Sequence, residues 1–248
     1  MTRARLRRAA IGAVALMSSV GAAAIEVPDT LAQRLLACTA CHGKEGRAAP
    51  DGYYPRIAGK PAGYLYAQLL NFRDGRRRFA PMTALLDNLS DAYLREIADH
   101  FASLQAPHPA PRPATVPAAA LARGRMLVED GDPGLRIPAC RECHGRSLTG
   151  TSPFIPGLLG LPRDYLNAQL GAWRAGQRRA ASPDCMATIA RRLSPADTGS
   201  VSAYPASLPV PIAPATGARS PQRPLECGST VSVGSGRDAG SRAGGSPR

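Results

Sequence analysis

Apolar residues in the first half of the chain recur at helical spacing. Leu65, Leu69 and Phe72 fall on one face of a helix, because a helix has about 3.6 residues per turn. Pro61 stands at the start of this stretch and Gly75 at its end, and these are the places where helices favour proline and glycine. The pattern therefore predicts a helix between Pro61 and Gly75.

Three more predicted helices are marked by residues that cap helix ends. They begin after Asp29 or Thr30, after Ser90 and at about Ala118, and they end at Leu36, at about Leu104 and at about Val128. Long loops connect them. Short helices joined by long loops indicate an all-α fold.

The pattern of the first half returns in the second half, in a register that drifts slightly. The hexapeptide that begins at Tyr64 (Tyr-Leu-Tyr-Ala-Gln-Leu) recurs from Tyr165 (Tyr-Leu-Asn-Ala-Gln-Leu). Further matched pairs are Pro55 and Pro156, Gly59 and Gly160, Gly75 and Gly176, Met82 and Met186, Ser90 and Ser194, and Leu104 and Leu208. The chain is therefore interpreted as a tandem duplication of one small domain.

The repeat and the shifts in composition set the expected domain boundaries. Residues 25–104 and 118–208 are the two domains, called here the first copy and the second copy. Residues 105–117 contain five prolines and are expected to form an extended, semi-rigid linker. Residues 209–248 have almost no large apolar side chains, so we expect a disordered tail, with a basic tether to a membrane or partner as the alternative.

The first 24 residues have the features of a secretory signal peptide. Arginines precede an apolar run from Ala9 to about Val20, and small residues from Ala22 to Ala24 follow it as a cleavage site. The alternative is an uncleaved anchor, but this run is shorter than the about 20 residues that cross a bilayer. A periplasmic protein is expected, with peripheral membrane association left open.

Charge limits the class of partner. The formal net charge is +13, of which the leader carries +4 and residues 209–248 carry +3, so residues 25–208 hold only +6. Aromatic residues make up 5% of the chain. Nucleic-acid binding needs a concentrated basic stripe or an aromatic platform, so no nucleic-acid partner is expected. A mildly basic surface suits brief docking on acidic redox partners.

Two cysteine-histidine motifs supply the candidate chemistry. The first consists of Cys38, Cys41 and His42, and the second of Cys140, Cys143 and His144. Two thiols at this spacing can form thioether links to a haem, and the adjacent histidine can bind its iron. We therefore expect two covalently bound haem c groups. Zinc or dithiol chemistry is the alternative, but zinc needs four ligands, and His100 and His108 are poorly placed to complete a site.

Methionines are the candidate sixth ligands of the two irons. Met82 lies 40 residues after His42, and Met186 lies 42 residues after His144, each expected on a loop before the last helix of its copy. Histidine-methionine ligation favours the reduced iron and fast electron transfer. These methionines could instead fill gaps in the core, which is the role we assign to Met126.

Three further features of the candidate sites stay open at this stage. Cys185 could replace Met186 as a thiolate ligand, or it could pair with Cys227 as a disulfide in an oxidising compartment. Carbonyl groups at Pro55 and Pro156 could accept the free N–H of each histidine, although both prolines could be ordinary loop formers. The arginines that end the matched helices could bind haem propionates, present a docking surface or be solvated, and they are Arg76, Arg77, Arg78, Arg178 and Arg179.

Taken together, these motifs resemble the di-haem cytochrome c4 family over about residues 29–208. The resemblance rests on both Cys-x-x-Cys-His motifs, on Pro-Arg-Ile-Ala-Gly from Pro55, on the run from Tyr64 to Arg77, and on Met82. It implies two class I cytochrome c folds that face each other, each with a His/Met-ligated haem. It also implies electron transfer from a quinol-oxidising complex or dehydrogenase to a terminal oxidase.

One departure from the family pattern concerns the last helix of the second copy. Thr198-Gly199 and Pro205 stand where the first copy has good helix formers, and an interior proline costs about 3 kcal/mol. This helix, and the position of Met186, are therefore in doubt.

The leading hypothesis is an electron-transfer protein without enzyme activity of its own. The alternatives are a haem enzyme, such as a peroxidase or a sulfur-compound dehydrogenase, with an open or thiolate-ligated second haem, or a cytochrome subunit of a larger dehydrogenase or oxidase complex.

Overall fold

A computed structural model describes residues 30–48, 52–111, 113–211 and 224–230. The predicted signal peptide, residues 1–24, lies outside these residues. By its internal contacts the chain divides into two units, Met1–Leu36 and Ala37–Arg248. In the described residues, no helix is long and apolar enough to cross a membrane.

The first unit contributes one short helix, α2 (Leu31–Arg34). The Thr30 side chain accepts a hydrogen bond from the Gln33 amide at 3.2 Å, so the predicted cap is confirmed at Thr30. The helix does not run through to Leu36 as predicted, because Leu35 ends it and a separate helix follows.

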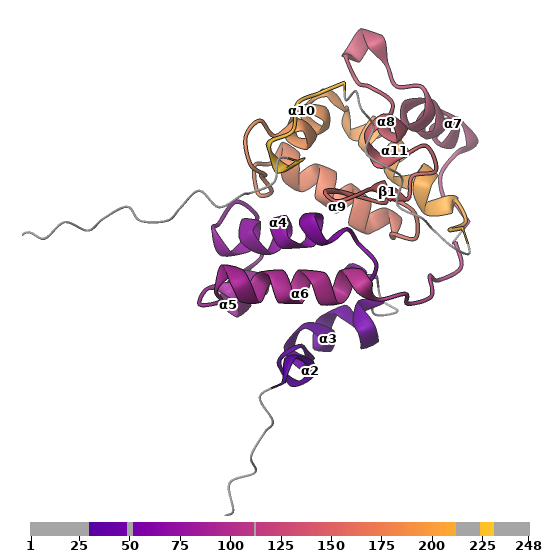
Figure 1. Ribbon diagram of the computed structural model, residues 1–248. Coiled ribbons are helices and arrows are strands. Elements are labelled where there is room, and N and C mark those ends of the chain that lie inside the picture. The colour runs from indigo at the N-terminus through magenta and orange to yellow at the C-terminus, as the bar shows by residue number, and fades with distance from the viewer. Residues whose placement is uncertain (1–29, 49–51, 112, 212–223, 231–248) are drawn as a thin grey trace, which may run out of the picture. The chain divides into compact units, whose positions relative to one another are not determined.

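The described residues of the second unit are mainly helical, as the sequence predicts, and they add one small sheet that was not predicted (Figure 1). Its first part contains α3 (Leu36–His42), η1 (Lys44–Gly46), α4 (Ala62–Arg73), α5 (Ala80–Leu86) and α6 (Asp91–Ser103). Its second part contains α7 (Ala118–Glu129), η2 (Pro133–Leu135), α8 (Cys140–His144), β1 (Gly150–Thr151), β2 (Ile155–Pro156), α9 (Arg163–Arg174), α10 (Cys185–Arg192), α11 (Pro195–Ser207) and η3 (Gly228–Thr230). Strands β1 and β2 pair antiparallel, with Gly150 opposite Pro156.

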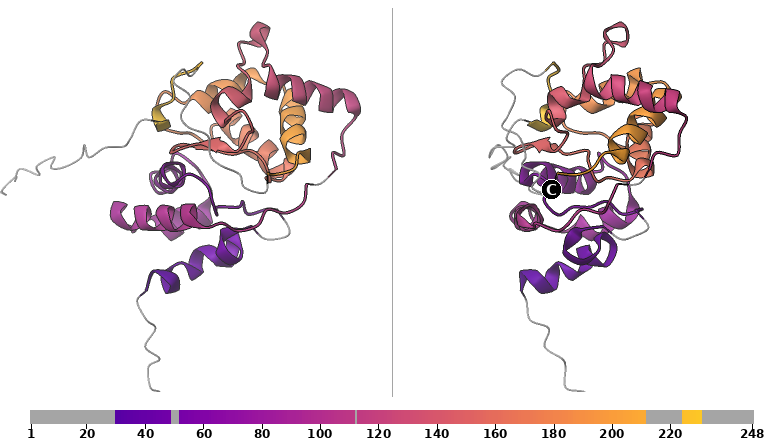
Figure 2. Two further views of the ribbon diagram at one scale, coloured as in Figure 1. Left: turned by 45° about the vertical axis from the view of Figure 1, so that its right-hand side comes forward. Right: turned by 90° about the vertical axis from the view of Figure 1, so that its right-hand side faces the viewer.

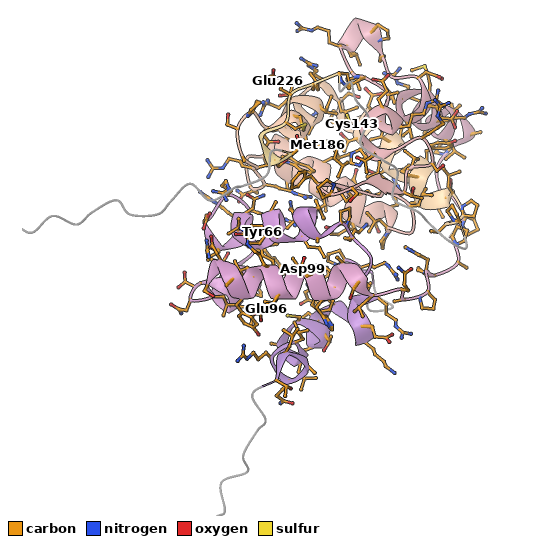
Figure 3. The ribbon with its side chains drawn as sticks, viewed as in Figure 1. Tyr66, Glu96, Asp99, Cys143, Met186 and Glu226 are labelled. Atoms are coloured by element: carbon orange, nitrogen blue, oxygen red, sulfur yellow. A yellow bond between two sulfur atoms is a disulfide. The ribbon has the colours of Figure 1, made fainter. Side chains whose placement is uncertain are left out.

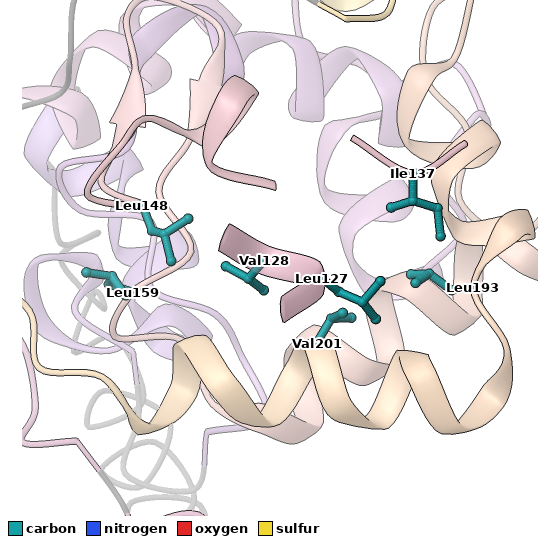
Figure 4. Close-up of a cluster of buried hydrophobic side chains, with 7 residues drawn as sticks. All are labelled: Leu127, Val128, Ile137, Leu148, Leu159, Leu193 and Val201. Carbon is teal, nitrogen blue, oxygen red and sulfur yellow. The ribbon is translucent and has the colours of Figure 1, made fainter. Parts of the chain in front are cut away.

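Two helix pairs recur in the two copies (Figure 2). Helix α4 packs against α5 and α6, and α9 packs against α10 and α11. Leu94 and Phe101 are buried on α6, and Leu127 and Val201 are buried where α7 meets α11 (Figure 4). The repeat in the sequence therefore corresponds to a repeat of helix packing.

The last helix of the second copy was in doubt from the sequence, but the structure shows α11 as a complete helix. Ser194 and Asp197 form a capping box at its start, and Arg123 of α7 donates to Asp197 at 2.7 Å. Pro205 lies in the last turn, where its missing N–H removes one hydrogen bond, and its ring is fully buried. Capping and packing therefore outweigh the cost of the proline.

Close approach of two helices explains why small residues are needed here. A Cβ atom on Gly124 of α7 would lie 2.2 Å from the Ser200 carbonyl oxygen of α11.

Met126, by contrast, is 37% exposed on α7, so its predicted core role is wrong. The buried face of α7 carries Leu127 and Val128 instead.

Part of the predicted disordered tail is ordered. A disulfide joins Cys227 to Cys185, and Cys227 is buried. The Gly228 amide also donates to the Pro183 carbonyl oxygen at 2.9 Å. The prediction of disorder is therefore wrong for residues 224–230. Their composition provides too little apolar surface to offset the loss of chain entropy on ordering, but the disulfide bond supplies that compensation.

The linker is anchored at its start. Arg56 is 5% exposed and donates to the carbonyl oxygens of Ala58 at 3.1 Å, of Pro107 at 2.7 Å and of Ala106. This side chain therefore fastens residues 106 and 107 to the first copy.

Candidate functional site

Each cysteine-histidine motif lies on a short helix. Helix α3 carries the first motif and α8 carries the second, so the two cysteines of each motif, three residues apart, share a helix face. All four motif cysteines are thiols in this structure, and Figure 3 labels Cys143 on α8. The Cys140 Sγ lies 3.8 Å from the Leu127 carbonyl oxygen, at the edge of the apolar cluster of the second copy.

The two histidines are held in the same way. His42 Nδ1 lies 2.8 Å from the Pro55 carbonyl oxygen, and His144 Nδ1 lies 2.8 Å from the Pro156 carbonyl oxygen. A carbonyl oxygen can only accept, so Nδ1 carries the proton and Nε2 keeps its lone pair. The expectation that Pro55 and Pro156 supply these carbonyls is confirmed.

Burial favours the neutral form of both imidazoles. His42 and His144 are each 8% exposed, and loss of hydration lowers the pKa of both, against the opposing effect of the proline carbonyls. Nearby cations add to the lowering, Arg77 at His42 and Lys60 at His144. A neutral imidazole with a fixed Nδ1–H and a free Nε2 fits an iron ligand.

The two motifs do not gather the donors of a zinc site. Burial raises the pKa of Cys38, and it raises the pKa of Cys140 to about 12. In the described part of the chain, no three His, Cys, Asp or Glu side chains gather as a metal ion requires. The donor set of each motif fits covalent haem c better than it fits zinc.

Local structure positions the proline carbonyl in each copy. In the second copy, Pro156 belongs to β2, and Thr151 of β1 donates to the Cys143 carbonyl oxygen at 3.1 Å. In the first copy, the amides of Ile57 and Ala58 both donate to the Gly46 carbonyl oxygen, at 2.8 and 3.0 Å. The β1–β2 hairpin in the second copy and a hydrogen-bonded turn in the first copy therefore hold the proline-containing loop close to the cysteine-histidine motif.

Aromatic rings connect the His42 side of the first site to its Met82 side. The Tyr54 ring contacts the His42 ring with centroids 6.1 Å apart, and it contacts Phe79 at 6.4 Å. Phe79 is the residue before α5, and Met82 lies in the first turn of that helix. These ring contacts lead from His42 to the start of α5, and Met82 lies on this helix, where a loop was predicted.

Met186 occupies the equivalent first turn of α10 (Figure 3). Asp184 caps this helix by accepting from the Ala187 amide at 3.0 Å. Cys185 beside it is held in the disulfide with Cys227 and has no thiolate to offer an iron. Both methionines were predicted on loops, but each lies in the first turn of a short helix.

The sequence did not reveal the main polar contact between the copies. Arg77 donates to Gln169 at 2.8 Å, and Arg178 donates to Gln68 at 3.0 Å, so each arginine reaches the other copy. Each guanidinium also lies near the other copy's matched tyrosine. Their backbones pair antiparallel, with the Arg179 amide donating to the Arg76 carbonyl oxygen at 2.8 Å.

These two arginines are therefore neither solvated helix-end charges nor a docking surface. Arg178 is 5% exposed, and its guanidinium lies 3.8 Å from the Trp173 ring centroid. Only their matched positions in the repeat could have marked Arg77 and Arg178 as a pair.

Known proteins of similar sequence share both copies. No family model matches the chain. A thiosulfate dehydrogenase electron acceptor from Thiomonas intermedia (strain K12) is 38% identical over 174 residues, 70% of this chain and 79% of that protein. Cytochrome c4 from Pseudomonas aeruginosa is 36% identical over 170 residues, 67% of this chain and 81% of that protein.

Solved structures agree with the sequence comparison. Reduced cytochrome c4 from Pseudomonas stutzeri superposes with a TM-score of 0.61 at 30% identity, covering 71% of this chain and 95% of that chain. A thiosulfate dehydrogenase from Marichromatium purpuratum also gives a TM-score of 0.61, at 34% identity, with 69% of this chain matched to 36% of that one. With its two motifs and its repeated helix packing, the chain belongs to the cytochrome c4 family of di-haem electron carriers, and its cofactors are two haem c groups.

Proposed function

We propose that each motif attaches one haem, with Cys38 and Cys41 forming the first pair of thioethers and Cys140 and Cys143 the second. His42 and His144 would bind the two irons through Nε2. The observation that carries this assignment is the matched pair of buried imidazoles, each with its Nδ1 fixed on a proline carbonyl at 2.8 Å.

The sixth ligands in this proposal are Met82 and Met186. Both lie in the first turn of equivalent short helices, and the aromatic contacts from His42 through Tyr54 to Phe79 lead to the helix of Met82. Each haem, when bound, would supply one-electron chemistry. The protein's part would be to hold its two iron-ligand side chains in place, which keeps reorganisation small.

The electron donor we propose is a dehydrogenase that oxidises a sulfur compound. Relatives from Thiomonas intermedia and Stutzerimonas stutzeri are both named thiosulfate dehydrogenase electron acceptors. The superposition on part of a thiosulfate dehydrogenase supports the same class of donor. A terminal oxidase or another acceptor receives the electrons, and the mildly basic surface supports brief docking.

The second haem has no catalytic role in this proposal. A thiolate-ligated iron at Cys185 would have supported an enzyme, but the disulfide with Cys227 occupies that sulfur. The periplasm is the proposed location, supported by the leader sequence and by a disulfide that requires an oxidising compartment.

Haem content and electron acceptance test this function. The purified full-length protein should carry two covalently bound haems with low-spin spectra. Thiosulfate should reduce it only when a catalytic amount of a thiosulfate dehydrogenase is added. Reduction by thiosulfate without that enzyme would contradict the carrier role, and no reduction in its presence would exclude this donor class.

Methionine variants test the sixth ligands. Met82→Ala and Met186→Ala should each open one iron to added imidazole, seen as a change in the visible spectrum at half of the haem. Met126→Ala is the matched control, because Met126 is 37% exposed on α7 and should leave both haems closed. An unchanged spectrum in either ligand variant would reject that residue as a ligand.

A further inference from the structure

An exposed apolar side chain stands at the tip of a loop that the described part of the first copy lacks. Residues 130–139, called here the η2 loop, connect α7 to α8. In the first copy a single residue, Leu35, separates α2 from α3, the helix of the first motif. In Figure 2 the η2 loop projects beyond α7 and α8. Residues 133–136 form an unbroken exposed run, in which Leu135 is 39% exposed.

Hydrogen bonds hold the η2 loop in one shape. The backbones of Asp132 and Ile137 exchange two hydrogen bonds, at 2.7 and 2.9 Å, which close the base of the loop. The Asp132 carboxylate accepts from the Leu135 amide at 3.2 Å and from Arg123 of α7 at 3.0 Å. Ile137 is buried in the apolar cluster of the second copy and so anchors the loop. A loop that is ordered in advance loses little conformational entropy when a partner binds.

A second exposed apolar side chain lies at the foot of the loop. Met126 of α7 is 37% exposed, and its carbonyl oxygen accepts from the Gly131 amide at 3.0 Å. Its Sδ lies 4.0 Å from the Arg123 Nη1 that also bonds Asp132. Two of the five large apolar side chains that are exposed in the described residues therefore belong to this surface. Exposed apolar side chains that are grouped and bordered by polar groups mark protein interaction sites.

Arginines border this apolar surface. Arg136 follows the tip leucine, is exposed and has a left-handed backbone with a φ of 55°. Arg192 of α10 donates to the Arg136 carbonyl oxygen. Both carboxylates of the loop are paired with arginines, Asp132 with Arg123 at 3.0 Å and Asp130 with Arg141 at 3.7 Å. The border is therefore positive, and it complements a partner surface with an acidic rim.

The η2 loop leads directly into the helix of the second motif. Helix α8 begins at Cys140, and Ala139 just before it is 3% exposed. A protein bound to the loop would therefore contact the segment next to the second motif. Electron transfer slows steeply with distance, so this is a favourable place for a redox partner to bind.

We propose that the η2 loop and Met126 form the surface on which the electron donor docks, with Leu135 inserted into an apolar hollow of the donor and Arg136 facing its acidic rim. The donor is the sulfur-compound dehydrogenase of the proposed function, on which this inference rests. A small apolar contact bordered by charge gives fast encounter and fast release. Such a surface fits a carrier that leaves its donor after each electron.

Substitution of the tip residue tests this surface in the full-length holo-protein. Initial rates with thiosulfate and a catalytic amount of a thiosulfate dehydrogenase give kcat/KM for the protein as electron acceptor. Leu135→Ser should lower kcat/KM by about fivefold, the effect of truncating a side chain that contributes to an interface. Leu135→Met keeps an apolar tip and should keep the rate. Reduction by ascorbate needs no docking and should be the same in both variants.

Two further variants separate position and charge. Leu36→Ser is the matched control, because Leu36 is 55% exposed on the helix of the first motif and should leave kcat/KM unchanged. Arg136→Asn removes the charge but keeps a residue that tolerates the left-handed backbone. It should lower kcat/KM at low ionic strength and match the unmodified protein at about 1 M salt, where the screening length is about 3 Å.

The proposal is overturned if the dehydrogenase reduces Leu135→Ser as fast as the unmodified protein, if Leu36→Ser loses as much, or if Leu135→Met behaves like Leu135→Ser. It is also overturned if ascorbate reduction of Leu135→Ser slows equally, or if Arg136→Asn has no effect at low ionic strength. Failure of the proposed function gives a different result. Ascorbate would then reduce the unmodified protein but the dehydrogenase would not, and the docking surface would be rejected together with its donor.

Discussion

The disulfide between Cys185 and Cys227 should be a main source of stability in the second copy. It closes a loop with a sequence separation of 42 residues. The chain-entropy relation for a loop of this size gives about 4 kcal/mol at 25 °C, because the cross-link removes conformations from the unfolded chain. Cys185→Ser should therefore lower the free energy of unfolding of the second copy by about 2 to 4 kcal/mol.

Denaturant unfolding of the oxidised holo-protein measures this loss, with the single Trp173 in the second copy as the fluorescent probe. Three variants make the test specific. Cys185→Ser, Cys227→Ser and the double variant break the same bond, so all three should lose the same free energy. The loop that precedes Met186 should also open more often, which raises the affinity of the second haem for added imidazole.

The reasoning is refuted if the double variant loses less than about 1 kcal/mol, or if it loses the sum of two large single effects. It is also refuted if imidazole affinity rises at the first haem, because the disulfide is confined to the second copy and the tail.

Three further predictions follow from packing and charge. Gly124→Ala should cost about 1 to 3 kcal/mol of stability, measured by denaturant unfolding, because its Cβ would lie 2.2 Å from the Ser200 carbonyl oxygen. Arg178→Met should cost about 2 kcal/mol in the same assay, because it removes the charged hydrogen bonds from Arg178 to Gln68 and Tyr64 of the other copy. Asp197 has its pKa lowered by its hydrogen bond from Arg123, so its stabilising effect should be present above about pH 4 and be lost as the pH falls further. Lowering the pH from about 6 to about 3 should therefore destabilise the unmodified protein more than Asp197→Asn.

Each of these predictions has a control or an excluding result. Gly199→Ala on α11 is the control for Gly124→Ala, because no neighbouring atom lies within 4 Å of the new Cβ. It should raise the free energy of unfolding by about 0.5 to 1 kcal/mol, as the helix propensities of alanine and glycine predict. A decrease would show that these propensities do not apply at this position. Arg179→Met removes an exposed neighbour and should cost less than about 0.5 kcal/mol, and an effect equal to Arg178→Met would discount the contact between copies. Equal acid sensitivity with and without the Asp197 carboxylate would reject its ion pair as the cause.

Local signals in the sequence predicted the elements that hold the site. Thr30 and Ser90 cap the helices that follow them, since a side-chain oxygen can satisfy an amide three residues away without help from the rest of the fold. Pro55 and Pro156 could be recognised because each follows its motif histidine at a similar separation in the sequence. A histidine that binds a metal also needs a hydrogen-bond acceptor for its other ring nitrogen.

Contacts between distant residues were not predictable in this way. The helix through Pro205 forms because the Ser194 capping box and packing against α7 outweigh a poor local propensity. The exposure of Met126 depends on which face of α7 meets α11. The pairing of Cys185 with Cys227 had to stay open, because a disulfide depends on a distance that the sequence does not contain.

The arginine contact between the copies has a consequence for the history of the chain. Arg77 of the first copy donates to Gln169 of the second, and Arg178 of the second copy donates to Gln68 of the first. Each copy therefore contributes one arginine and one glutamine, at matched positions of the repeat. A contact of this kind is self-complementary, as in a twofold homodimer. A single domain that carried these residues would have the means to pair with itself, and joining two such domains in one chain makes the pairing independent of protein concentration. Two halves of one chain can also differ where the pairing does not constrain them, as the matched residues Lys60 and Leu161 do.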